Sequence, residues 1–210
     1  MSNNDELNLP VIKESTLPTL IDITNALGVP REVLASDEEI QYAWRDLPRE
    51  LNRIPPEIRN ELLARMCIAI ANGLFDGAIN YAWNASIIQL RERIKDFGLS
   101  VVSQILTKQF DDEKLSDLTD ANLLSLCLQL NLISEEGFFF LDQCRDIRNN
   151  FSAAHPNMGL VDDRELVTFI NRCAKYALSS TTNPRGVDIN AFIIAIKTTN
   201  TASNEAIKKK

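Results

Sequence analysis

The spacing of apolar residues between Ile58 and Ile94 constrains the fold of this chain more than any other feature. They recur in steps of three, four and five, which is the spacing of one face of an α-helix. The stretch predicts one long helix or two nearly collinear helices. Gly73 and Gly77 predict a kink or a close helix contact within it. The apolar residues are Ile58, Leu62, Leu63, Met66, Ile70, Leu74, Ile79, Trp83, Ile87, Leu90 and Ile94.

Helix start and stop signals divide the rest of the chain into further elements. No alternating strand pattern is longer than about four residues. The expected helical stretches are 17–27, 36–47, 58–97, 101–110, 121–130, 134–155, 164–178 and a last one from 188. The predicted fold class is therefore all-α, a helical bundle of four to five main helices with small N-terminal helices.

This pattern also predicts the organisation of the chain. Residues 1–16 are polar and are expected to be a disordered N-terminus. Short N-terminal helices are expected over 17–54 and the helical bundle over 55–197. Residues 198–210 are expected to form a polar, lysine-rich tail.

Charge is unevenly distributed along the 210 residues. Residues 1–144 hold 12 Lys and Arg against 23 Asp and Glu, a net charge of −11. Residues 145–210 hold 10 against 6, a net charge of +4, so the whole chain carries −7. The overall acidity argues against broad, non-specific binding of nucleic acid. It leaves room for one local anion site near the basic C-terminal third.

Four cysteines and a single histidine limit the metal chemistry of the chain. No two cysteines form a Cys-x-x-Cys pair, so buried free thiols in a reducing compartment are expected, and no metal or other cofactor. No apolar run reaches the roughly 18 residues of a membrane span. The polar, acidic start is unlike a signal peptide. We therefore expect a cytoplasmic protein without a membrane partner.

The segment from Arg145 to Pro156 is the strongest candidate for chemistry. On a helix, steps of three, four and three place Arg145, Arg148, Ser152 and His155 in one stripe. Arg148 and His155 then differ by about 20° in direction and about 10 Å in height. Elsewhere the chain lacks a glycine-rich phosphate loop, a Gly-x-Ser-x-Gly motif and a carboxylate–histidine cluster.

This stripe suits cleavage of RNA without a metal. Arginine offers a charged fork for phosphate oxygens, and histidine exchanges protons near neutral pH. The reaction needs both a base and an acid, yet His155 is the only histidine. A twofold dimer would bring two copies of His155 to one cleft.

A structural alternative stays open at this point. Arg148 could pair with Asp142 or Asp146 on the surface, and His155 could be a helix C-terminal residue stabilised by the helix dipole.

The same segment resembles the signature of the HEPN superfamily. Its nuclease members carry Arg, four to six residues and then His, often with Asn directly after the Arg. Arg148 and His155 fit with six residues between them, and Asn149 follows Arg148. The context, Ile147-Arg148-Asn149 and Ala153-Ala154-His155-Pro156, is also similar to the family's. The resemblance covers roughly 55–180, and residues 1–50 have no counterpart.

The resemblance implies an HEPN-like metal-independent endoribonuclease active as a homodimer, in a bacterial toxin–antitoxin or anti-phage defence setting. His155 would transfer protons, Arg148 would stabilise the phosphate and Asn149 would orient one of them. Arg145 and Ser152 are substrate-binding candidates from helix geometry alone. The expected partners are RNA, a second copy and an antitoxin or regulatory domain. The alternatives are a non-catalytic module that binds RNA, nucleotide or protein, and a helical scaffold.

The run Phe138-Phe139-Phe140 is a further feature to place. Three consecutive residues cannot all face one side of a helix. At least one of these rings is therefore expected to meet another element or a partner chain.

Overall fold

The computed structural model describes residues 7, 9–12, 17–151 and 159–179. In these residues every regular element is a helix or a helical turn, so the predicted all-α fold is confirmed. The elements are α1 (Leu17–Ala26), η2 (Arg31–Val33), α2 (Asp37–Leu51), η3 (Pro56–Ile58), α3 (Glu61–Ala71), α4 (Phe75–Phe97), α5 (Leu99–Leu106), α6 (Asp112–Ser116), α7 (Asp120–Gln129), α8 (Glu135–Phe151), α9 (Asp163–Cys173) and η4 (Ala174–Leu178).

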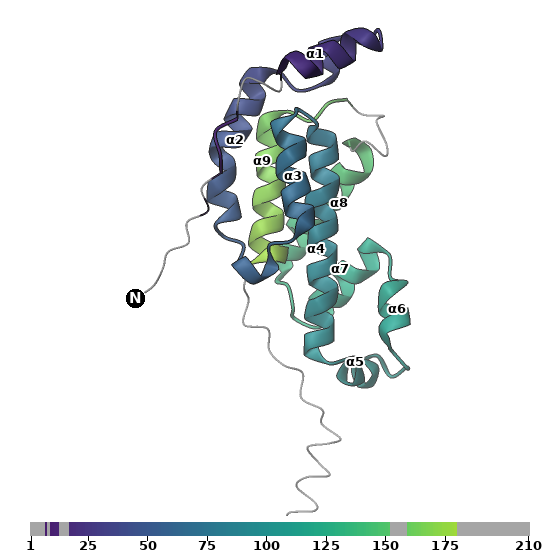
Figure 1. Cartoon of the computed structure of the whole chain (residues 1–210). Helices are drawn as coiled ribbons and strands as arrows, with labels where there is room; N and C mark the ends of the chain where they lie inside the picture. Colours follow the sequence, from purple (N-terminus) through teal and green to yellow (C-terminus); the bar gives the residue numbers. More distant parts are fainter. Residues whose placement is uncertain (1–6, 8, 13–16, 152–158, 180–210) are drawn as a thin grey trace, which may run out of the picture.

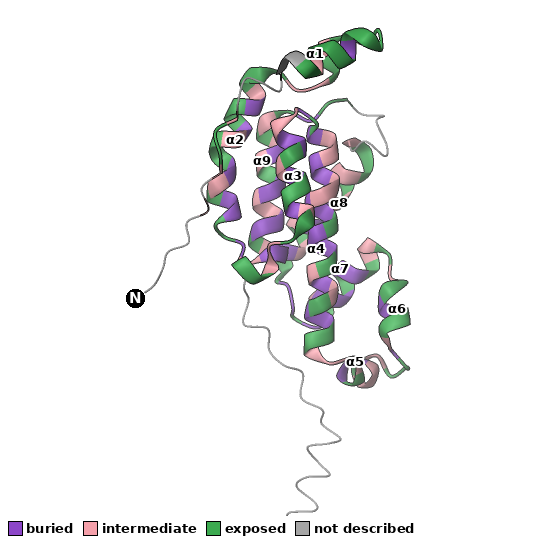
Figure 2. Cartoon of the chain, in the orientation of Figure 1, coloured by how far each residue is buried: buried purple, intermediate pink, exposed green. Residues whose placement is uncertain are grey.

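Helix α4 is the centre of the bundle. It packs against α3, α7, α8, α9 and η4, and Figure 1 shows α3, α8 and α9 running beside it. Helix α2 lies outside this group against α3 and α9, and the short helices α5 and α6 lie at the far end. Figure 2 shows the buried positions concentrated on the faces that these helices turn toward one another.

The periodic stretch from Ile58 is neither one helix nor two collinear ones, so that prediction was wrong. Helices α3 and α4 fold back on each other as a hairpin joined by the turn 72–74. The turn is set by Gly73, which has a left-handed φ of +73°. A side chain at this glycine would lie 3.2 Å from the backbone N and O of Ala35, and Ala35 N–H donates to the Gly73 carbonyl at 3.0 Å.

We expect Gly73→Ala to destabilise the fold by about 1–3 kcal/mol, because it adds a clash with fixed backbone to the cost of a left-handed φ. Gly28 is the matched control, with a φ of +67° and nothing within 4 Å of an added Cβ. Gly28→Ala should therefore cost only the backbone strain. Urea unfolding of both variants measures the difference, and equal losses would contradict the role given to the turn.

Helix α2 runs past the predicted end at Leu47 and includes Pro48. Proline removes one backbone donor within a helix, but the last turn buries Glu50 and Leu51, and this packing keeps it helical. The helix begins with a capping box. Ser36 Oγ accepts from Glu39 N–H, and the Glu39 carboxylate accepts from Ser36 N–H at 2.7 Å.

Several predicted boundaries are confirmed. Thr119 caps α7 and Asp162 caps α9, each accepting from the backbone three residues on. Gly98 ends α4 with a φ of +108°. The predicted continuation of α8 to His155 and the helix from Asp188 lie outside the described residues. Helix α6, only five residues long, was too short for the apolar spacing to predict.

Arg93 fixes the end of η4 to the middle of the bundle. It is 1% exposed, and its guanidinium donates to the carbonyl of Tyr176 at 3.0 Å and to that of Ser179 at 2.8 Å. Burial lowers the pKa of Arg93. These two bonds satisfy carbonyls that the helix end leaves without an intrahelical donor.

The thiols are free, and three of the four are buried. Burial raises the pKa of Cys127 to about 12 and that of Cys67, which is half-buried, to about 11. The neighbouring Cys173 thiol and burial raise the pKa of Cys144. These raised pKa values keep the thiols of Cys67, Cys127 and Cys144 protonated and unreactive at neutral pH.

Candidate functional site

The C-terminal half of α8 carries three of the five predicted site residues, Arg145, Arg148 and Asn149. Ser152 and His155 lie outside the residues that the structure describes. Ile147 and Phe151 hold this half of the helix against the core. Arg145 and Arg148 are three residues apart and therefore neighbours on the helix surface. The structure thus brings the two arginines and Asn149 together on the last turns of α8.

Arg145 is held by two carboxylates. Its Nη2 lies 3.1 Å from Asp142 Oδ1 and 3.0 Å from Asp146 Oδ1, and its side chain is 23% exposed. The aspartates that could have paired with Arg148 are therefore engaged by Arg145. This pairing cancels most of the positive charge that Arg145 could offer to an anion.

Arg148 has a different environment. Its Nη1 donates to Asn149 Oδ1 at 3.0 Å, and among the described residues no carboxylate lies within 4.0 Å of its guanidinium. Its Nε is buried without a hydrogen-bond partner in the same part of the chain, as is the Nε of Arg145. Buried donors without acceptors are uncommon in folded proteins, and Arg91 Nε on α4 is a third such donor among the described residues. Arg148 is thus a cation oriented by Asn149, and its Nε–H group has no acceptor among the described residues.

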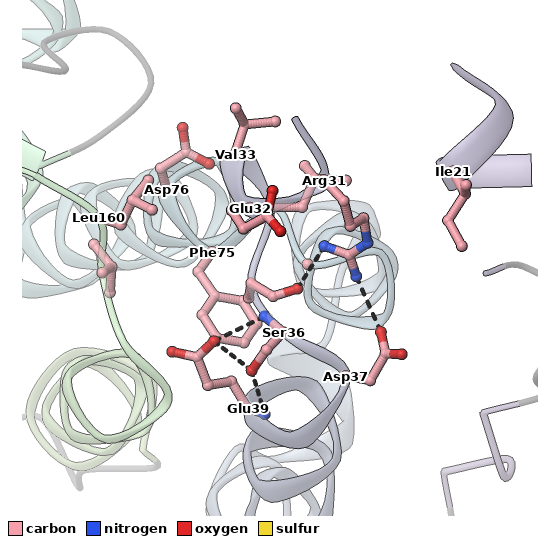
Figure 3. Close-up of a pocket in the computed structure, with 14 residues that line it drawn as sticks. Ile21, Arg31, Glu32, Val33, Ser36, Asp37, Glu39, Phe75, Asp76 and Leu160 are labelled. Carbon is pink, nitrogen blue, oxygen red and sulfur yellow. Dashed lines mark hydrogen bonds and ion pairs between the residues drawn. The ribbon is translucent and has the colours of Figure 1, made fainter. Parts of the chain in front are cut away.

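A cavity of about 420 Å³ lies near the starts of α2 and α4 (Figure 3). Leu160 and Val161, shortly after the segment that contains His155, form part of its lining. Arg31 also lines the cavity but is engaged, donating to Ala35 O at 2.8 Å and to Asp37 Oδ1 at 3.0 Å. No spacing or motif in the sequence predicts this cavity, because its walls come from segments that are far apart along the chain.

The three phenylalanines of α8 face different surroundings, as expected. Phe140 stacks on Tyr176 with ring centroids 5.6 Å apart, and the guanidinium carbon of Arg172 lies 5.1 Å from its ring centroid. Phe139 is 56% exposed. Phe139 and Arg148 are nine residues apart, which is two and a half helical turns, so they lie on opposite sides of α8. A partner chain that contacted Phe139 would therefore not bring two copies of Arg148 together.

The described ranges contain neither a metal-binding cluster nor a helix that could span a membrane. No three His, Cys, Asp or Glu side chains of these residues are grouped so that they could hold a metal ion. None of the described helices has the length and apolar character needed to cross a membrane.

Comparison of the chain with protein-family models, curated proteins and solved structures finds no match. The HEPN resemblance therefore stays a prediction that depends on the motif around Arg148 and His155.

Proposed function

We propose that this chain is a metal-independent endoribonuclease that acts as a cytoplasmic homodimer in a bacterial toxin or anti-phage defence system. The observation that carries the proposal is the environment of the Arg148 guanidinium. It is a cation at the end of α8 without a carboxylate partner among the described residues, oriented by Asn149 at 3.0 Å. It lies seven residues before the only histidine of the chain.

The proposed reaction is an attack of the RNA 2′-hydroxyl on its own phosphate. His155 of one protomer accepts the 2′-hydroxyl proton as the bond from O2′ to phosphorus forms. His155 of the second protomer donates a proton to the 5′-oxygen as the bond from phosphorus to O5′ breaks. The products are a 2′,3′-cyclic phosphate and a free 5′-hydroxyl. Arg148 stabilises the negative charge that develops on the phosphate oxygens.

Arg145 and Ser152 have secondary roles in this proposal. Asp142 and Asp146 already neutralise Arg145, so it contributes less to phosphate binding than Arg148. Its buried Nε remains a donor without a partner in the described part of the chain. Ser152 offers a hydroxyl one turn beyond Arg148 on the predicted continuation of the helix.

The proposal is tested by incubating purified protein with single-stranded RNA in excess EDTA. We expect cleavage with 2′,3′-cyclic phosphate ends, and no cleavage of DNA of the same sequence, because DNA lacks the nucleophile. Absence of cutting, or equal cutting of DNA, would contradict the proposal. The protein is purified from a ribonuclease-deficient strain, so that contaminating ribonucleases do not account for the cleavage.

The ion pairs of Arg145 favour a second candidate, a non-catalytic HEPN-like module that binds RNA, nucleotide or a partner protein such as an antitoxin. One available arginine per protomer suits anion contact better than strong phosphate stabilisation. Such a module would bind RNA with an affinity that falls as salt rises, and it would leave the RNA intact.

A further inference from the structure

A second surface lies on the opposite flank of the molecule from α8, between α2 and α3. It is a groove of about 580 Å³ whose walls are mostly apolar. Residues 7 and 9–12 lie along it, and the other residues of the predicted disordered N-terminus, 1–16, lie outside the described residues. The groove is lined from the two helices by Trp44, Leu51, Leu63, Cys67, Ile68 and Ala71.

The groove holds the backbone of this N-terminal segment. The Trp44 indole N–H donates to the Pro10 carbonyl at 3.0 Å, and Leu7 N–H donates to Asn52 Oδ1 at 2.9 Å. Trp44 and Asn52 are eight residues apart, about 12 Å along a helix. Leu7 and Pro10 are three residues apart, which spans about 10 Å only when the chain is extended. The segment therefore runs extended and antiparallel to α2.

Both hydrogen bonds recognise main-chain atoms, so the groove does not require the resident side chains. Arg59 is the charged residue of the lining, and its Nε already donates to the Ile54 carbonyl at 2.9 Å. The walls therefore suit an uncharged, extended peptide whose apolar side chains enter the groove. This combination of main-chain hydrogen bonds and apolar contact is a common mode of peptide recognition.

The resident segment fills the groove only in part. Val11 is 88% exposed, and Ile68 in the wall is 63% exposed, while Leu7, Leu9 and Ile12 are half-buried. Half-buried side chains gain only part of the 1.5–3 kcal/mol that full burial provides, roughly. Segments with so few buried contacts open readily.

We propose that the groove between α2 and α3 binds an extended apolar peptide of a partner protein, and that residues 7 and 9–12 occupy it until that peptide displaces them. A second copy is disfavoured as the occupant, because its identical segment makes no new contact and competes with a tethered one at high effective concentration. A partner peptide that fills the remaining volume can displace the resident segment. This inference does not depend on the nuclease proposal.

The test uses a fluorescent peptide with the sequence of residues 6–13 and the full-length chain. Leu9→Asp places a charge on the resident segment and should free the groove. We expect the peptide to bind this variant at least tenfold more tightly than wild type. Leu7→Ser gives an independent way to loosen the segment, and circular dichroism checks that both variants stay folded.

Further substitutions in the Leu9→Asp chain test whether the peptide binds in the groove. Ile68→Asp puts a charge in the groove at an exposed position and should weaken peptide binding at least tenfold. Ile88→Asp is the matched control, since Ile88 is 45% exposed on α4 outside the groove lining. Trp44→Phe keeps an apolar ring, removes the indole donor and should weaken binding severalfold.

Three results would overturn the proposal. These are failure of the peptide to bind either loosened variant, equal affinity for loosened and wild-type chains, and equal effects of Ile68→Asp and Ile88→Asp. A wild-type dimer that Ile68→Asp dissociates in sedimentation would also overturn it, since the occupant would then be a second copy. RNA cleavage is measured separately, so failure here is distinguishable from failure of the nuclease proposal.

Discussion

Replacing His155 by alanine is expected to lower RNA cleavage by a factor of about 10²–10⁴, the usual contribution of general acid–base catalysis. Replacing Arg148 by alanine should lower it by about 10²–10³, the usual cost of losing one group that stabilises transition-state charge. Initial rates of cleavage of a labelled single-stranded RNA in EDTA measure both effects. Unfolding curves should be close to that of wild type, because neither change removes a buried apolar side chain.

Arg65→Ala is the matched control for the loss of a positive charge. Arg65 is exposed on α3 and lies 3.7 Å from Glu61, far in sequence from the candidate site. Its removal changes the net charge by the same amount as removal of Arg148. Cleavage by the Arg65 variant should stay within about twofold of wild type, because exposed ion pairs contribute little. Equal losses in the two arginine variants would mean that net charge, rather than the site, determines the activity.

Trp83→Ala is expected to give the largest loss of stability, about 3–5 kcal/mol, as for other buried large-to-small changes. Trp83 is fully buried on α4, in the centre of the bundle. Its ring meets Phe169 of α9 edge-on with centroids 6.5 Å apart, and its Nε1–H donates to Asp120 Oδ2 at 2.7 Å. The substitution therefore leaves a cavity and also removes a link between α4 and the start of α7.

Urea unfolding followed by far-UV circular dichroism measures this loss. Phe139→Ala serves as the control, because an aromatic that is 56% exposed should change stability by only about 0.5 kcal/mol. A loss below about 1 kcal/mol for Trp83→Ala would contradict the central position given to α4.

Local sequence signals predicted the helices well, because caps and apolar spacing act within a few residues. Thr119 and Asp162 are N-caps at the starts of α7 and α9, close to the predicted starts of these helices. Gly73 predicted a kink or a close helix contact, but the full reversal of direction was missed, because the three residues of the turn interrupt the apolar spacing only briefly. What sets that turn is the close approach of Ala35, a contact between distant segments.

The same limit applies to the two functional surfaces. Arg145 and Asp142 are three residues apart on one helix, so their ion pair could have been predicted from the sequence. On the sequence alone, Asp142 and Asp146 were instead considered as partners of Arg148. The groove between α2 and α3 depends on contacts between Leu7 and Asn52 and between Pro10 and Trp44. Residues 34 to 45 positions apart meet there, and no spacing rule connects them.

A mixed dimer tests the central claim most directly, that two protomers share one phosphodiester through Arg148 and His155. Wild-type and His155→Ala chains with different tags are co-expressed, and dimers that carry both tags are purified. If both copies of His155 act at one cleft, the mixed dimer should lose cleavage by a factor of about 10² or more, like the doubly substituted dimer. A mixed dimer that keeps half of the wild-type rate would contradict the shared site.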